Sequence, residues 1–177
     1  HIYPFFLKTL IIFSKSWVTG MLSTVSNNCL IFNPLSNFAI NDYSLALGTG
    51  SWAAGEFSIA LGTYVLASRE SSVALGKNTE ASGTSSIAIG TECLTKGDSS
   101  VALGFDTHTM ARRSIAIGNM ASTHGHFSIA MGKETTAYGH NSTALGTGLS
   151  AQSFGEAVFG VYNTDYTPES ATDYDAD

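Results

Sequence analysis

A glycine recurs every 14 residues from Gly48 to Gly160, nine times without an insertion or a deletion. Most copies read Ser-x-Ala-x-Gly, with a large apolar residue at each x. A fixed short period over many copies is typical of a solenoid. Fourteen residues can hold two short strands and two tight corners, but not two helices with their turns. The sequence therefore predicts an all-β parallel β-roll, a single stack of 14-residue coils about 4.8 Å apart.

Small residues alternate with larger ones in both halves of each repeat. Because successive side chains of a strand point to opposite faces, the small residues share one face. We expect that face to line a narrow tube, since larger side chains between sheets need a spacing of about 10 Å. The predicted interior includes Ser58, Ala60, Gly62, Ser86, Ala88, Gly90, Ser114, Ala116 and Gly118.

The opposite face of the first strand carries a continuous row of large apolar residues, called here the apolar stripe. It consists of Leu45, Leu47, Ile59, Leu61, Val73, Leu75, Ile87, Ile89, Val101, Leu103, Ile115, Ile117, Ile129, Met131 and Leu145. Burying one such side chain is worth about 1.5–3 kcal/mol. A monomer tolerates exposed apolar patches of only a few hundred Å². The stripe therefore predicts a subunit interface and an obligate oligomer.

Composition and motifs argue against several classes of function. With 44% hydrophobic and 12% charged residues the chain is not disordered, and its net charge of −6 argues against a nucleic-acid partner. The repeated serines are structural, and the Gly-x-Gly fragments belong to the repeat and precede no predicted helix, so they do not form a phosphate loop. The acids are scattered over the coils rather than paired in a cleft. We expect no catalytic residues, no cofactor and no enzymatic activity.

Three segments are expected along the chain. Residues 1–35 form an apolar, irregular segment, and Ile2–Phe13 is too short for a membrane span, which needs roughly 20 apolar residues. A truncated signal sequence and a poorly ordered or preceding-domain segment both remain open for it. Residues 36–161 form the roll, whose last copy replaces the inward Ser and Ala by Glu156 and Val158. Residues 162–177 are acidic and aperiodic, as in a connector to a downstream domain.

The outer face of the second strand carries mostly polar residues, with a few candidates for ligand contact. Large aromatic and Arg side chains anchor many interfaces, although each can also be an isolated exposed residue. The possible ligand face consists of Trp52, Arg112, Arg113, Tyr138 and Phe154.

Three histidines form a weak metal candidate. His124 and His126 lie two apart and share a face, and His140 follows one coil later, about 4.8 Å from His126. This spacing is compatible with Zn²⁺ or Ni²⁺. A solvated face without a metal is the interpretation we prefer.

The Ser-x-Ala-x-Gly copies between Ser44 and Gly160 are followed at fixed spacing by Ala or Thr and then usually Gly two residues later. They resemble the head repeats of trimeric autotransporter adhesins, the YadA-like head. The resemblance implies a left-handed parallel β-roll and a homotrimer. It also implies a virulence-related head that projects from the outer membrane of Gram-negative bacteria and binds extracellular matrix proteins or other surfaces. The chain is then expected at the cell surface, tethered through other domains and not itself membrane-spanning.

Three classes of function remain to be compared. The leading hypothesis is a non-enzymatic adhesive head that attaches to host matrix or other surfaces. The alternative is a structural spacer or phage tail-fibre-like segment whose recognition is carried by another domain. A solenoid enzyme is a third class, and it requires a cluster of carboxylates on one face, which the sequence does not show.

Overall fold

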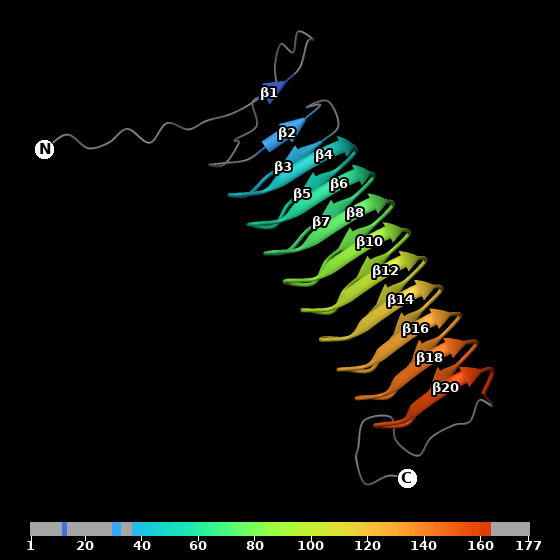
Figure 1. Cartoon of the computed structure of the whole chain (residues 1–177). Coiled ribbons are helices and arrows are strands. Elements are labelled where there is room, and N and C mark those ends of the chain that lie inside the picture. Colours follow the sequence, from blue (N-terminus) through green and yellow to red (C-terminus); the bar gives the residue numbers. More distant parts are fainter. Residues whose placement is uncertain (1–11, 14–29, 33–36, 164–177) are drawn as a thin grey trace, which may run out of the picture.

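The computed structural model describes residues 12–13, 30–32 and 37–163, and within these residues the chain is all-β. It is a parallel β-solenoid of about nine turns, with no helix in the part described. Figure 1 shows the coils stacked in one direction from β4 to β20. The predicted fold class is confirmed.

Each coil contributes one strand to each of two parallel sheets. The long-strand sheet has 11 strands: β1 (Ile12–Phe13), β2 (Leu30–Phe32), β4 (Leu45–Thr49), β6 (Ile59–Thr63), β8 (Val73–Lys77), β10 (Ile87–Thr91), β12 (Val101–Phe105), β14 (Ile115–Asn119), β16 (Ile129–Lys133), β18 (Thr143–Thr147) and β20 (Ala157–Val161). The short-strand sheet has nine: β3 (Phe38–Ala39), β5 (Trp52–Ala53), β7 (Leu66–Ala67), β9 (Glu80–Ala81), β11 (Leu94–Thr95), β13 (His108–Thr109), β15 (Ser122–Thr123), β17 (Thr136–Ala137) and β19 (Ser150–Ala151).

The register between coils follows the sequence period. Ile87 of β10 pairs with Val101 of β12, and Leu94 of β11 pairs with His108 of β13, each 14 residues apart. The first strands depart from this offset, because β2 pairs with β4 at 15 residues and β1 with β2 at 19. The long-strand sheet thus begins within residues 1–35, the segment that the sequence analysis expects to be irregular.

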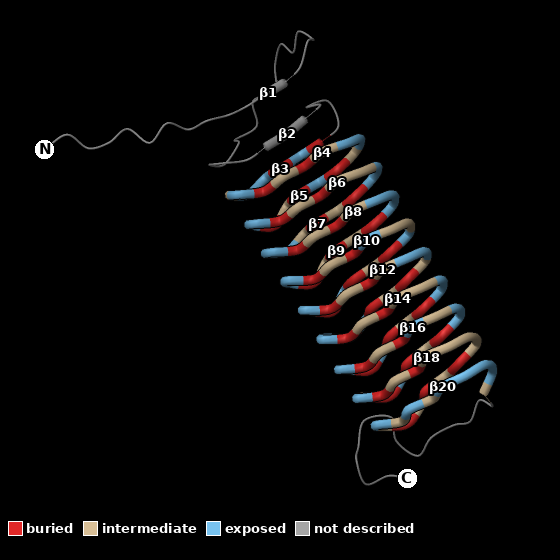
Figure 2. Tube along the Cα trace, in the orientation of Figure 1, coloured by how far each residue is buried: buried red, intermediate tan, exposed pale blue. Residues whose placement is uncertain are grey.

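Serine and alanine fill the interior of the coils. The side chains of Ser58, Ala60, Ser86, Ala88, Ser114 and Ala116 are all 0% exposed. Buried residues line the stack from β3 to β19 in Figure 2. Because these side chains are so small, the two sheets lie close together and the tube is narrow.

The repeated glycines have a different role from the one expected. Gly62, Gly90 and Gly118 are partly exposed, so they do not line the interior. A Cβ placed on Gly90, whose φ is +132°, would lie 1.9 Å from the carbonyl oxygen of Gly104 in the next coil. Glycine is therefore required because β10 and β12 approach each other closely at this pair of residues.

Each coil reverses direction at two residues in the left-handed region, such as Glu92 (φ 59°) and Ser99 (φ 55°). Their backbone amides still donate to the preceding coil, from Glu92 to the Lys77 carbonyl at 2.9 Å and from Ser99 to the Thr84 carbonyl at 2.8 Å. The hydrogen-bond ladder thus continues through the corners, and the polar backbone groups there are paired.

An asparagine stands at the same coil position at each end of the described roll. Asn163 accepts a hydrogen bond at Oδ1 from the Ser150 amide and donates from Nδ2 to the Ser150 carbonyl, each at 2.7 Å. Asn37 likewise accepts from the Ser51 amide at 2.9 Å and donates to the Gly48 carbonyl at 2.7 Å. At the C-terminal end, the Asn163 side chain thus bonds the backbone groups of β19, the last short strand, to which a further strand would otherwise pair.

The last copy keeps the register although its inward residues differ. Val158 of β20 pairs with Ala144 of β18, and Glu156 accepts a hydrogen bond at Oε2 from the Ser153 amide at 2.9 Å. The larger side chains therefore end the narrow interior without displacing β20 from the sheet.

We expect the inward serines to contribute unequally to stability. Ser86 Oγ donates to the Gly83 carbonyl at 2.7 Å and accepts from Thr95 Oγ1 at 3.1 Å. Ser142 Oγ is buried without a hydrogen-bond partner among the described residues. Ser86→Ala should lower the free energy of unfolding by about 1–3 kcal/mol, because it removes both hydrogen bonds of a buried hydroxyl, and Ser142→Ala should have little effect. Urea denaturation of the two variants tests this, and equal losses would contradict it.

Candidate functional site

The apolar stripe lies on the outer side of the long-strand sheet. None of its 15 side chains is buried, and Ile89 and Met131 are 37% and 38% exposed. Parallel pairing places each member directly beside its counterpart in the next coil, as in Ile89 with Leu103. The single chain thus carries a row of half-exposed apolar side chains along the length of the roll.

The residues proposed for the ligand face are distributed along the rod. Trp52 is 47% exposed and packs edge-on against Phe38, with 5.0 Å between ring centroids. Tyr138 directly follows β17, which is six strands away from the β5 strand of Trp52. The two side chains are therefore about 29 Å apart along the axis of the roll. These residues therefore form separate exposed points rather than one cluster.

The other three candidates lie at the corners that follow the short strands. The Arg112 guanidinium contacts Asp98 with 3.6 Å between Nε and Oδ2, and both side chains are exposed. Arg113 lies over the Phe127 ring at 5.3 Å from its centroid. Phe154 is half-buried, in the last coil. The exposed contacts of Arg112 and Arg113 stabilise a fold only weakly, so these two side chains remain available for contacts with a partner.

The three histidines do not converge on one point. The rings of His126 and His140 have centroids 4.8 Å apart, as the coil spacing predicts, but His124 stacks on Tyr138 with 4.8 Å between centroids. His126 Nδ1 also accepts a hydrogen bond from the Arg112 amide at 3.2 Å. In residues 12–13, 30–32 and 37–163, no group of three His, Cys, Asp or Glu side chains is placed to hold a metal ion. The structure thus brings His126 and His140 together, while His124 packs on Tyr138 instead.

Burial lowers the pKa of His124, and the positive charge of His108 lowers it further. The folded chain thus favours the neutral imidazole over the protonated one. The resulting stabilisation is present above the ordinary pKa of histidine and is lost as the pH falls through the lowered value.

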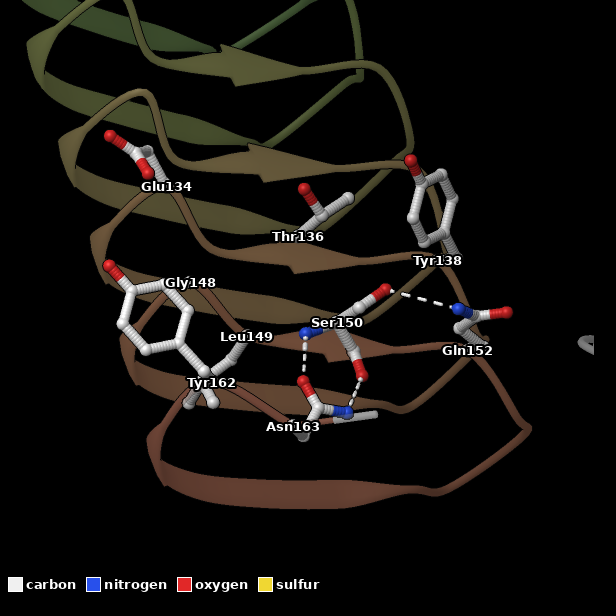
Figure 3. A pocket seen from close by; sticks show the side chains of 9 residues that line it. All are labelled: Glu134, Thr136, Tyr138, Gly148, Leu149, Ser150, Gln152, Tyr162 and Asn163. Atoms are coloured by element: carbon white, nitrogen blue, oxygen red, sulfur yellow. Dashed lines mark hydrogen bonds between the residues drawn. The ribbon is translucent and has the colours of Figure 1, made fainter. Parts of the chain in front are cut away.

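A groove of about 620 Å³ lies on the outer face of the short-strand sheet near the C-terminal end of the roll. Its lining consists of Glu134, Thr136, Tyr138, Gly148, Leu149, Ser150, Gln152, Tyr162 and Asn163 (Figure 3). Of these residues only Tyr138 is a candidate from the sequence. The sequence does contain a signal for this groove: Ser122, Thr136 and Ser150 are small, whereas most earlier coils have a larger side chain at the same position.

No helix in the described residues has the length and apolar character needed to cross a lipid bilayer. A comparison with curated proteins finds no match to the chain. A family model described as YadA head domain repeat (2 copies) matches residues 39–64, 67–92, 96–121, 111–135 and 124–148. These matches cover more than half of the chain and follow the coils seen in the structure. The chain therefore belongs to the family of YadA head domain repeats.

Proposed function

We propose that the chain is the head of a trimeric, cell-surface adhesin of the autotransporter type, which attaches to host matrix or other surfaces. The observation that carries this proposal is the apolar stripe, half-exposed over the whole length of the roll. Membership of the YadA head family supports an adhesin-like role and favours it over the spacer or tail-fibre alternative.

Association through the stripe explains why so many large apolar residues point outward. Burying the remaining exposed area of each side chain contributes in proportion to that area, at about 25 cal/mol per Å². Since every coil presents the same two positions, parallel copies of the rod match one another coil by coil. The stripe supports oligomerisation in general, and the choice of a trimer rests on the family.

The proposed trimer leaves the short-strand sheet facing outward, where it offers contacts to a ligand. Trp52, Arg113 and Tyr138 are exposed on this side and present ring faces and positive charge, which are frequent in interface anchors. The proposed role is recognition and not catalysis. The proposed place is the bacterial cell surface, with tethering to the outer membrane through other domains of a longer protein.

Two measurements on the full chain test the proposal. Light scattering at micromolar concentration should give three times the chain mass of 18.6 kDa. Binding to wells coated with collagen, fibronectin or laminin should saturate for at least one coating, and the double variant Trp52→Ala, Arg113→Ala should weaken it. A monomer in solution, or no binding to any coating, would contradict the proposal.

A further inference from the structure

The groove exists because side chains at one coil position become small near the C-terminal end. Trp52, Leu66 and Leu94 occupy this position in earlier coils, at the start of β5, β7 and β11. In β17 and β19 the same position is taken by Thr136 and Ser150. Because parallel pairing stacks these positions, the small residues lower the outer surface of the sheet over adjacent coils and form the floor of the groove.

Two tyrosines stand on opposite sides of this floor, as Figure 3 shows. The Tyr162 ring rests against Gly148, where a Cβ would lie 2.3 Å from its Cδ1 atom. Tyr138 stacks on His124 of the preceding coil with 21° between the ring planes. Its other face is turned toward the coil of Gln152, which also lines the groove. The Tyr138 ring is thus held by its stacking on His124 before any ligand binds, which lowers the entropic cost of binding.

The polar groups between the tyrosines offer both donors and acceptors. Gln152 Nε2 donates to Ser150 Oγ at 3.4 Å, and the Thr136 hydroxyl lies beside them on the floor. The Glu134 carboxylate is the one acidic group of the lining, and Lys133 Nζ lies 3.2 Å from its Oε1. The lysine offsets this negative charge, so the groove favours an uncharged polar ligand over a polyanion.

The edge of the short-strand sheet is closed to an added peptide strand at this point. The amide and the carbonyl of Ser150 are both bonded to the side chain of Asn163, at 2.7 Å each. An extended peptide adds to a sheet through such backbone groups, and here they already have partners. A ligand in the groove must therefore be recognised through side chains.

We propose that this groove binds a neutral oligosaccharide. The apolar face of a pyranose ring can pack against the exposed parts of the Tyr138 and Tyr162 rings, and its hydroxyl groups can form hydrogen bonds with the hydroxyls and the amide on the floor. A volume of about 620 Å³ is within the usual range of ligand sites and exceeds the size of one sugar ring. This inference rests on the proposed function in one respect: the proposed trimer leaves the short-strand sheet, and with it the groove, facing outward.

The test is binding of the full chain to an array of immobilised glycans. The array carries neutral oligosaccharides of glucose, galactose and N-acetylglucosamine, with sulfated and sialylated ones for comparison. Ser150→Leu and Thr136→Leu each fill the floor and should weaken binding of the neutral glycan at least tenfold. Leu66 and Leu94 show that the fold accepts leucine at this coil position. Ser122→Leu is the matched control, since Ser122 has the same position but does not line the groove, and its affinity should stay within twofold.

Binding of no neutral glycan, a preference for sulfated or sialylated glycans, or undiminished binding by both floor variants would overturn the inference. Circular dichroism before the binding assay identifies any variant that is not folded. If one of the two floor variants does not fold, the binding of the other one tests the inference. A trimer that binds matrix proteins but no neutral glycan overturns this inference alone. A monomer that still binds a neutral glycan overturns the proposed trimer alone, because a single chain forms the groove.

Discussion

Gly90→Ala is expected to lower the free energy of unfolding by more than about 3 kcal/mol. The added Cβ would lie 1.9 Å from the Gly104 carbonyl oxygen and 2.9 Å from its carbon, which are backbone atoms of the paired strand β12. Relief requires β10 and β12 to separate, which breaks their ladder. Because each coil of a solenoid contacts only its neighbours, this divides the stack in the middle.

Gly160→Ala is the matched control, because it separates backbone strain from the clash between coils. Gly160 has a φ of +124°, close to the +132° of Gly90, but a Cβ there meets nothing within 4 Å. Its substitution should cost only the strain of an unfavourable backbone conformation, about 1–3 kcal/mol. Chemical denaturation followed by circular dichroism measures both variants. Equal losses would show that the close approach of the coils is not what requires glycine.

Ile89→Glu is expected to convert the proposed trimer into monomers. Ile89 is 37% exposed in the single chain and lies near the middle of the apolar stripe. In a symmetric trimer each substitution occurs three times, so three unpaired carboxylates would enter an apolar interface. Burying an unpaired charge costs several kcal/mol, and the three like charges also repel one another. Light scattering at micromolar concentration should then give a mass about one third of that of the unsubstituted protein.

Leu94→Glu is the control for this change, because it places the same charge on the opposite sheet. Glu80 already occupies the equivalent position one coil earlier, where it pairs with Leu94. The variant should therefore keep both the fold and the trimer mass. If Ile89→Glu remains trimeric, or if Leu94→Glu also dissociates, the stripe is not the interface.

The period and the alternation of the sequence predict most of the fold. A constant offset of 14 residues predicts the pairing of every coil from β4 to β20, because an insertion in any repeat would have shifted it. The alternation of small and large residues predicts which side chains are buried, as in Ser86 and Ala88. Residues two apart on a strand lie on the same face, and the small ones share the inner face. It does not predict the role of Gly90, since a glycine fits equally where space is lacking inside the tube and where it is lacking between coils.

Other features depend on contacts that no local pattern encodes. The left-handed corners include Arg113 and Met120, residue types with no preference for that conformation, so the sequence does not mark them. The groove depends on side-chain size at one coil position and on Tyr162, which follows the last repeat. For the three histidines, the spacing predicts the distance between His126 and His140 but not the packing of His124 on Tyr138.

The uniform offset between coils makes the reach of this head adjustable in equal steps. Duplicating one 14-residue unit adds a layer of about 4.8 Å while every other layer keeps its neighbours. The partner chains of a trimer would lengthen together, so the contact between them would grow in proportion. A lineage can thus change the length of the rod by tandem duplication or loss, without redesigning any single contact.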